Sequence, residues 1–296
     1  MAYTLEQGSH GLQKEVVDSM VKQIAAQTYK FRQMVTVEST DALDNTFFRE
    51  DPAVLTANGI DNIMSTTYGT AIATMHPKWE RLTSRVATFK NENNIAWEIL
   101  KGSVINMEAR TIIKLTQANV KRNDDYLWDQ LSASQNFAQS FEQQSYTVAT
   151  GAYWNGLSAS IVNDVAAAIR MIGDKFYDNT NCLMFCSPRD VQSIKKYFHD
   201  KGAQYNALGE DMALNGRVSR IAGATIVESP SVTASYALLG VPKICATYKE
   251  FVPIQSTTIE DPYKSWTLRV VQEGVLEITD PKALVIIRGT QGTDGL

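Results

Sequence analysis

The chain has 296 residues, of which 44% are hydrophobic and 20% are charged, a composition typical of a globular protein rather than a disordered or fibrous one. Its formal net charge of −4 excludes a generally basic surface, so any contact with nucleic acid is expected to be local. No apolar run approaches the roughly 20 residues that span a bilayer, and the N-terminal residues lack a signal-peptide pattern, so we expect a protein made and used in the cytosol.

The first predicted element is an amphipathic helix of roughly 20 residues that starts near Leu12, with Ser9 as a cap before it. Its apolar side chains recur at helical spacing, and they are Val16, Val17, Met20, Val21, Ile24 and Phe31. The sequence leaves two docking partners open for this apolar face, which are the body of the same chain and a neighbouring subunit.

Residues 36–94 are rich in Thr, Asn, Asp and Gly and show no strong period. So long a weakly patterned stretch is unusual in a compact domain unless it is a functional loop or arm, and we predict an extended arm or hairpin. Residues 95–103, IAWEILKGS, place Ile95, Trp97 and Ile99 in alternation, which predicts a strand leading directly into the next element.

Residues 105–131 predict one long helix, here called the spine helix. At ~1.5 Å per residue it is ~40 Å long, whereas a globule of this length has a radius of gyration of about 19 Å. Its narrow apolar stripe consists of Ile105, Ala109, Ile112, Ile113, Val120, Leu127 and Leu131. Much of the remaining surface is charged, by Lys114, Lys121, Arg122, Asp124 and Asp125. We therefore expect a helix that is packed along one side and solvated along the other.

A second helix is predicted at 158–176, capped by Ser158 or Ser160, and the apolar run CLMFC at 182–186 then predicts a buried strand. SPRD at 187–190 combines a capping serine, a proline at the first helical position and an acid at the third, so a helix starts there. This strand-to-helix junction is the best-specified local structure in the sequence.

Short strands bounded by Gly, Pro or Ser are predicted at 224–229, 236–240 and 243–248. Residues 265–278 alternate like a strand, and with the turn TDPK and the strand ALVII they predict an antiparallel hairpin that closes the fold. Because helices and strands are interspersed without a regular βαβ repeat, the predicted class is α+β.

The sequence carries no motif for catalysis or for binding a cofactor or a metal. GLSAS at 156–160 lacks the second glycine of a nucleophile elbow, and no phosphate-binding glycine loop is present. The three histidines have no spacing that suits zinc, and they are His10, His76 and His199. We therefore expect no enzyme, no cofactor and no metal site.

The other reactive or charged groups also have structural interpretations. The three cysteines are an odd number in apolar surroundings, which predicts reduced and buried thiols at Cys182, Cys186 and Cys245. Adjacent acids such as Asp124 and Asp125 lie in polar surroundings, so solvated charge is preferred to an acid and base pair.

From about residue 85 to the C-terminus, the chain resembles the major capsid proteins of tailed double-stranded DNA viruses, of phage or archaeal type, that share the HK97 fold. The matching segments are IAWEILKGSVINMEARTIIKL, IVNDVAAAIRMIGDKF before CLMFCSPRDVQSIKKYF, VSRIAGATIVESP, and WTLRVVQEGVLEITDPKALVIIRGT. SPRD and the closing DP.A..II.GT are the most specific parts, and the order and spacing of all segments carry the resemblance.

The resemblance implies five regions, which are an N-terminal arm with the amphipathic helix at 1–45, an extended E-loop region at 46–94, a peripheral domain with the spine helix at 95–157, an axial domain at 158–253, and C-terminal strands returning to the peripheral domain at 254–296. It also implies a homo-oligomer of hexamers and pentamers that forms an icosahedral shell around double-stranded DNA, assembled in the host cytoplasm as the virion capsid. The partners it implies are portal, scaffolding and decoration proteins and the packaged DNA, contacted non-specifically, with no membrane.

Some members of this family join an E-loop lysine covalently to an asparagine, assisted by a glutamate seven residues after it. Laid against YKSWTLRVVQEG, Ser265 takes the place of the asparagine and Gln272 that of the glutamate. A slip of one residue brings Glu273 into place but still leaves Ser265 without an asparagine beside it. We therefore expect no cross-link and a shell held together non-covalently. The short arm leaves no room for a fused scaffolding domain, so we expect a separate scaffolding protein or assembly without one.

Lys114, Lys121 and Arg122 on the exposed side of the spine helix are candidates for intersubunit or inner-surface contacts, and a simple solvated face explains them equally well. Two other interpretations of the whole chain stay open. One is an encapsulin-type cellular nanocompartment, whose shell encloses a cargo enzyme instead of a genome. The other is an unrelated α+β enzyme or binding domain, which would form a monomer or a small oligomer.

Overall fold

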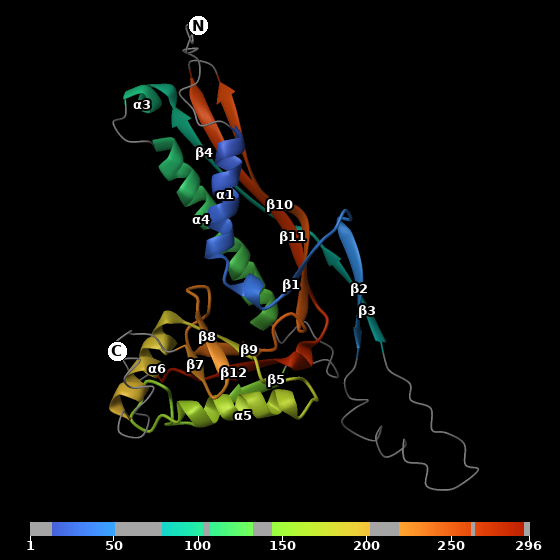
Figure 1. Cartoon of the computed structure of the whole chain (residues 1–296), viewed down its shortest axis with the longest axis vertical. Helices are drawn as coiled ribbons and strands as arrows, with labels where there is room; N and C mark the ends of the chain where they lie inside the picture. Colours follow the sequence, from blue (N-terminus) through green and yellow to red (C-terminus); the bar gives the residue numbers. More distant parts are fainter. Residues whose placement is uncertain are drawn as a thin grey trace, which may run out of the picture.

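The computed structural model describes residues 14–50, 79–102, 107–132, 144–201, 219–261 and 264–292. These residues form two halves, each built on one sheet, and a two-stranded hairpin beside them (Figure 1). We call the halves four-stranded and six-stranded after their sheets. The mixture of helices with parallel and antiparallel strands confirms the α+β class.

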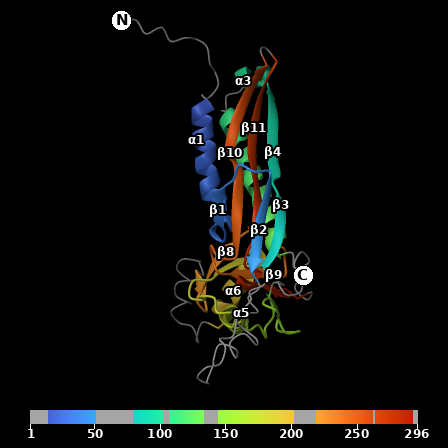
Figure 2. The same cartoon turned by 90° about the vertical axis from the view of Figure 1, so that its right-hand side faces the viewer.

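The four-stranded half is an elongated plate (Figure 2). Its strands, in spatial order, are β1 (Thr36–Ser39), β10 (Ala246–Asp261), β11 (Ser265–Ile278) and β4 (Ala87–Ala96). Strand β1 is parallel to β10, and the other neighbours are antiparallel. Strands β10 and β11 pair from Ala246 with Ile278 to Asp261 with Ser265, with one register shift on each side of Val252, the second of which includes Pro253. Proline has no N–H to donate, which is why it occurs at sheet edges and irregularities.

The helices of this half are α1 (Lys14–Thr28), the short 3-10 helix η1 (Phe31–Gln33), α3 (Trp97–Gly102) and α4 (Met107–Ser132). Helix α4 packs on β11 and β4, and α1 packs against both α4 and β10. A small apolar core fills the space between them, and it includes Val17, Val21, Ala25, Ile112, Val120, Ile254, Leu268 and Val270. The carboxylate of Asp18 on α1 also accepts a hydrogen bond from the Ser256 amide on β10, 3.1 Å away. Helix α1 therefore docks on its own chain.

The spine helix is confirmed as one continuous element, α4. The expected strand at 95–103 is wrong beyond Ala96, because α3 begins at Trp97. Strand β4 pairs with β11 up to the partners Ala96 and Ser265, and Ser265 is the first residue of β11. Past this point β11 offers no backbone partners, so the chain satisfies its own hydrogen bonds by forming a helix.

Strands β2 (Asp44–Glu50) and β3 (Trp79–Arg85) form an antiparallel hairpin, paired from Asp44 with Arg85 to Glu50 with Trp79. This confirms the predicted hairpin within 36–94, and residues 51–78 of that stretch lie outside the described part. The hairpin lies against the lower end of β11 (Figure 1), where Ser84 Oγ donates to Glu277 Oε1 and Arg49 Nε donates to the Ile278 carbonyl.

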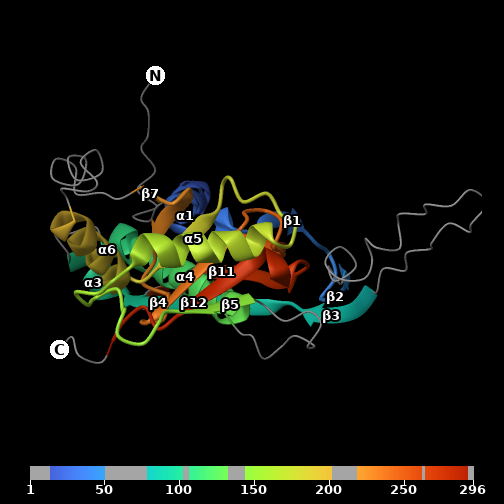
Figure 3. The same cartoon turned by 90° about the horizontal axis from the view of Figure 1, so that it is seen from below.

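The six-stranded half contains strands in the spatial order β5 (Gln144–Thr147), β12 (Leu284–Arg288), β9 (Tyr236–Gly240), β6 (Leu183–Cys186), β8 (Ala224–Glu228) and β7 (Arg220–Ile221). Its helices are α5 (Ile161–Gly173) and α6 (Pro188–Asp200), and α5 lies across β5, β12 and β9 (Figure 3). The larger apolar core of the chain is centred here, with Phe185, Ile172, Leu238, Val285 and Ile287 fully buried.

The predicted junction between strand and helix at 182–190 is confirmed. Ser187 stands at the N-cap of α6 and its side chain accepts the Asp190 amide, while Pro188 is the first helical residue. The helix predicted at 158–176 is α5, which begins after Ser160. Unlike Ser187, Ser160 makes no capping hydrogen bond to the backbone.

The predicted closing hairpin is wrong. Strand β11 pairs with β10 and β4, whereas β12 lies between β5 and β9 in the other sheet. The short helix η4 (Pro281–Ala283) turns the chain from one sheet to the other. Residues 284–288 therefore belong to the six-stranded sheet. The strand expected at 243–248 instead begins at Ala246 and continues to Asp261.

Candidate functional site

The described residues show no arrangement for catalysis. They contain no group of three or more side chains that could hold a metal ion. His199 is exposed, and His10 and His76 lie outside the described residues. None of the helices in the described part is long and apolar enough to cross a membrane.

The three cysteines are free and buried, which confirms the prediction of reduced thiols. Burial raises the pKa of Cys182 to about 11 and that of Cys245 to about 12, and it raises the pKa of Cys186 as well. All three are therefore protonated and unreactive at neutral pH.

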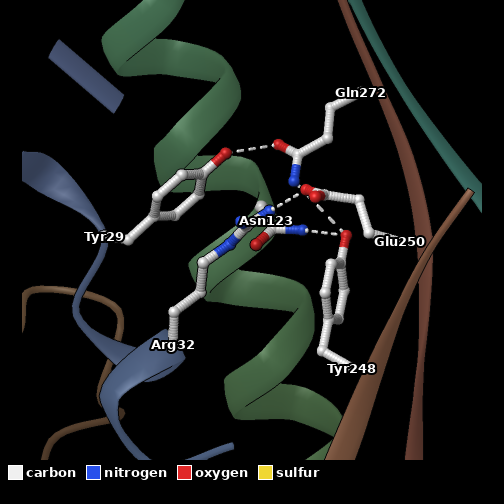
Figure 4. Close-up of polar contacts among 6 residues, drawn as sticks. All are labelled: Tyr29, Arg32, Asn123, Tyr248, Glu250 and Gln272. Atoms are coloured by element: carbon white, nitrogen blue, oxygen red, sulfur yellow. Dashed lines mark hydrogen bonds and ion pairs between the residues drawn. The ribbon is translucent and has the colours of Figure 1, made fainter. Parts of the chain in front are cut away.

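The most elaborate arrangement of polar side chains lies where α1 and η1 meet α4 and the sheet (Figure 4). Its members come from five elements or the turns beside them, and we call it the polar joint: Tyr29, Arg32, Asn123, Tyr248, Glu250 and Gln272. Tyr248, Asn123 and Gln272 are fully buried. A buried polar group must find a partner, so these contacts fix the position of the segment between α1 and β1.

Gln272 on β11 holds the end of the N-terminal helix. The Tyr29 hydroxyl donates to Gln272 Oε1 at 2.6 Å, and Gln272 Nε2 approaches the Tyr248 hydroxyl at 3.4 Å. Asn123 Nδ2, from the spine helix, donates to the same Tyr248 hydroxyl at 2.9 Å. Burial raises the pKa of Tyr248 to about 12 and raises that of Tyr29, so both phenols stay neutral hydrogen-bonding groups.

Arg32 contributes the one cation of the joint. Its guanidinium donates to Glu250 Oε1 at 2.8 Å and lies over the Tyr29 ring, with 3.9 Å from Cζ to the ring centroid. The Tyr248 ring is 5.1 Å from the same atom. An arginine fits this place because its planar group stacks on aromatic faces and binds a carboxylate at its edge.

Asp124 on α4 holds the start of η1. Its Oδ2 accepts the Lys30 amide at 3.1 Å, and the Phe31 amide also favours its charge. Burial nevertheless raises the pKa of Asp124 from 3.8 to about 6. The interpretation of Asp124 and Asp125 as a solvated pair is therefore wrong for Asp124, which is 4% exposed. A carboxylate at a helix N-terminus binds free amides, which explains why it is tolerated there.

The same short segment connects the two halves. Phe31 stacks on Phe185 of β6, with ring centroids 4.5 Å apart, and lies 6.1 Å from the Trp128 ring on α4. Met34 is also fully buried in the larger core. Arg32, the next residue, lies over Tyr29, which belongs to the smaller core, so the short helix η1 contacts both apolar cores.

Gly274 makes room for Tyr248. A Cβ at residue 274 would lie 2.3 Å from the Tyr248 hydroxyl oxygen and 2.9 Å from the Lys249 carbonyl oxygen, on the backbone of the paired strand. Both distances are shorter than any real contact of this kind, so the ring can cross β11 here only above a glycine.

The residues singled out from the sequence do not gather at one place. Lys114, Lys121 and Arg122 are exposed on α4. Ser265 is buried at the start of β11, and Gln272 is in the polar joint. Glu273 points to the opposite side of β11 and is paired with Lys90 Nζ at 3.0 Å.

Sequence reasoning missed the joint, although a signal for it exists. The apolar stripe predicted for the spine helix is sparse between Ile113 and Leu127, and Thr116, Asn119 and Asn123 occupy that gap as buried polar residues. On β11, Gln272 continues the inward alternation of Leu268 and Val270. A polar residue on an otherwise apolar face is the pattern that marks such a network.

No family model matches the sequence, and no curated protein matches it. Solved structures do match. The mature capsid of bacteriophage PhiM1 is 17% identical with a TM-score of 0.66, over 88% of this chain and 86% of that chain. The structure of Mycobacterium phage Che8 is 12% identical with a TM-score of 0.65, over 98% of this chain and 99% of that chain. The SrpI encapsulin of Synechococcus elongatus is 11% identical with a TM-score of 0.55, over 90% of each chain.

At these identities the likeness establishes the fold. The long helix on a plate-like sheet, the lateral hairpin and the second sheet with its helices are the HK97-like capsid fold. The fold expected from the resemblance is therefore confirmed over nearly the whole chain.

Proposed function

We propose that this chain is a major capsid protein that assembles into hexamers and pentamers of an icosahedral shell around double-stranded DNA. The observation that carries the proposal is the likeness of fold to the subunit of a phage capsid, which covers 88% of this chain and 86% of that chain. The subunit would be made in the host cytoplasm and become part of the virion, with portal, scaffolding and decoration proteins as its partners.

The architecture fits the needs of a shell subunit. A thin plate exposes much surface relative to its core, and such surface is stabilised when neighbouring copies cover it. The outward side of the hairpin carries Phe48 and Trp79, which are 56% and 58% exposed. In this proposal residues up to about 45 form the arm, and the hairpin belongs to the E-loop region. The rest of the four-stranded half belongs to the peripheral domain, and the six-stranded half belongs to the axial domain.

The shell would be held by non-covalent contacts. The position that aligns with the assisting glutamate of cross-linking relatives is Gln272, whose amide cannot take up a proton and is already bound by Tyr29. The position that aligns with their asparagine is Ser265, whose side chain has no amide group to react with a lysine. Mature particles boiled in SDS should therefore run as a single band near 32.9 kDa, and a ladder of covalent oligomers would contradict this part of the proposal.

A second candidate function is the shell of an encapsulin-type compartment, because an encapsulin is among the structural matches. The phage capsids match with the higher TM-scores, which favours the virus shell. Particles isolated from their natural source distinguish the two functions. Nuclease-protected duplex DNA and a portal ring indicate the virus capsid, whereas a co-purified enzyme enclosed in the shell indicates the compartment.

The first test is negative-stain microscopy of the purified chain, with mass photometry of the same sample. Closed shells or rings of five and six subunits are expected. A monodisperse monomer or dimer at all concentrations, both alone and with a co-expressed scaffolding protein, would contradict a shell function and favour an unrelated α+β domain.

A further inference from the structure

Four cations on the spine helix are exposed and have no ion pair with another described residue. We call them the spine cations, and they are Arg110, Lys114, Lys121 and Arg122. No acid occurs in the sequence between Arg110 and Arg122. The four acids of the helix lie outside this interval, and they are Glu108, Asp124, Asp125 and Asp129.

The cations on the sheet of the same half differ from the spine cations, because they form ion pairs. Every Lys or Arg on its described strands and on the turn between β10 and β11 is paired with a carboxylate. The pairs are Lys90 with Glu273 (3.0 Å), Lys249 with Glu38, Lys264 with Asp261 (3.1 Å) and Arg269 with Glu92 (2.8 Å). The four-stranded half therefore pairs the cations of its sheet with carboxylates, whereas the exposed cations of its long helix have no ion pair with another described residue.

The geometry of the row suits a linear polyanion. At ~1.5 Å per residue, Arg110 and Arg122 are ~18 Å apart along the helix axis. Arg110, Lys114 and Lys121 follow the spacing i, i+4 and i+11, so they line one face of the helix, and Arg122 flanks them. Along duplex DNA each strand has one phosphate per ~3.4 Å, so the row covers about five base pairs and is long enough to contact several phosphates.

The surroundings of the row favour nucleic acid over a protein partner. Protein interfaces depend on buried aromatic or aliphatic anchors. None of the large apolar side chains that are strongly exposed in the described part of the chain lies on α4. Phosphate contacts need no such anchor, because displaced counterions supply most of the free energy.

We propose that the spine cations bind the phosphate backbone of duplex DNA without reading its sequence. This inference rests on the proposed function and deepens it, because it assigns the α4 side of the subunit to the genome. One subunit binds weakly through four contacts, and the many copies of a shell add their contributions. The overall charge of −4 then coexists with a local surface that attracts DNA.

The test measures binding of a fluorescein-labelled 30-base-pair duplex to the full chain by anisotropy, from 50 to 200 mM NaCl. The chain is used below the concentration at which shells form, so that both sides of the subunit are accessible. The variant R110Q/K114Q/K121Q/R122Q should weaken binding at least about 30-fold at 50 mM NaCl. It should also lower the slope of log K against log [NaCl] by about 3.6, since each phosphate contact contributes about 0.9.

The matched control is R189Q/K195Q/K196Q/K201Q, which removes the same charge from α6 and the residue after it. Binding by this control should stay within about threefold of the unmodified chain, since its cations stand at i, i+6, i+7 and i+12 and do not line one face of the helix. An equal loss in both variants would show that net charge alone matters, and this would overturn the proposal. No loss in the α4 variant would overturn it as well.

Two further measurements test whether the row itself selects DNA. The smaller variant K114Q/K121Q should lower the slope by about 1.8, and it serves if the fourfold variant does not fold. Poly-L-glutamate of equal charge should compete poorly with the duplex, and strong competition would assign the row to an acidic protein segment instead. Microscopy of the same samples distinguishes a failure of this inference from a failure of the proposed function. If the chain forms shells but the spine cations do not bind DNA, only this inference is refuted. If the chain binds DNA but never forms shells, the proposed function is refuted.

Discussion

The two halves of the molecule bury their strands in different ways. In the six-stranded half, β6, β9 and β12 are buried at nearly every residue, which means that both faces of the sheet are covered. In the four-stranded half, β11 alternates between buried and half-buried residues over Leu268, Val270 and Gln272. Helices cover one face of that sheet, and its other face lacks a helix layer in the described part of the chain (Figure 2).

This difference explains where the polar joint lies. A sheet covered on both faces has room for a thick apolar core, and the polar groups of the six-stranded half, such as Asp190 and Thr290, bind one another beside α6. A thin plate has a small core, so the position of its helix depends more on specific hydrogen bonds. Buried polar groups specify one arrangement more sharply than apolar groups do, although they add less stability. The polar joint therefore fixes the position of α1 on the four-stranded sheet.

The largest expected effect on stability comes from Phe31, which connects the two halves of the molecule. Phe31→Ala should lower the free energy of unfolding by about 3 to 5 kcal/mol, because it removes a fully buried ring and leaves a cavity beside Phe185. Chemical denaturation followed by fluorescence and circular dichroism measures the loss. Leu157→Ala is the control, since Leu157 is 95% exposed and its loss should change stability by less than about 0.5 kcal/mol. A loss below about 1 kcal/mol for Phe31→Ala would mean that the two halves are not connected through this ring.

Asp124→Asn is expected to stabilise the chain, by about 1 to 3 kcal/mol at pH 7.5. The pKa of Asp124 in the folded chain is about 6 and its ordinary value is 3.8, so the folded chain binds the proton more tightly than the unfolded chain does. Acidification from pH 7 to pH 4 therefore stabilises the fold through this group, and above pH 6 its burial as an anion costs free energy. Asparagine keeps an oxygen for the Lys30 amide and carries no charge.

The pH dependence tests whether the charge of Asp124 is the cause. The advantage of Asp124→Asn should be greatest above pH 6 and should disappear below about pH 4, where the native carboxyl is protonated in both states. Thermal unfolding between pH 4 and pH 8 measures it. Asp129→Asn, on the exposed side of the same helix, should change stability by less than about 0.5 kcal/mol at pH 7.5. An advantage that is independent of pH would show that the charge is not responsible.

The sequence predicted the parts of this fold that depend on local pattern. The spine helix and the SPRD junction follow from spacing and capping within a few turns, and both are present. The strands that pair with β12 cannot be predicted from local pattern. A short apolar run has the same pattern whether the strand completes a hairpin or joins a different sheet. The polar joint could not be predicted from the sequence for the same reason. Tyr29 and Gln272 are 243 residues apart, and the sequence does not show that their side chains meet in the folded chain.

A double-mutant cycle measures the polar joint itself. Tyr29→Phe should cost about 1 to 2 kcal/mol, because the fully buried Gln272 Oε1 then loses the hydroxyl that satisfies it. Gln272→Leu should cost a similar amount by leaving the Tyr29 hydroxyl without its acceptor. The double variant should cost less than the sum by at least about 0.5 kcal/mol, because an apolar pair needs no hydrogen bond. Additive losses would show that the two side chains act independently of each other.

The smallest expected effect separates the joint from the charged surface of the same sheet. Arg269 and Arg32 both bind a carboxylate at 2.8 Å, but the Arg269 side chain is 43% exposed and that of Arg32 is 18% exposed and stacked on Tyr29. Arg269→Lys should change the free energy of unfolding by less than about 0.5 kcal/mol, and added salt should reduce the change further. Arg32→Lys should cost about 1 kcal/mol and be less sensitive to salt, because a lysine keeps the charge but cannot both stack and bind Glu250 at its edge. Equal costs at both sites would mean that the joint is held by charge alone, in which case any cation would register α1 on the plate as well as arginine does.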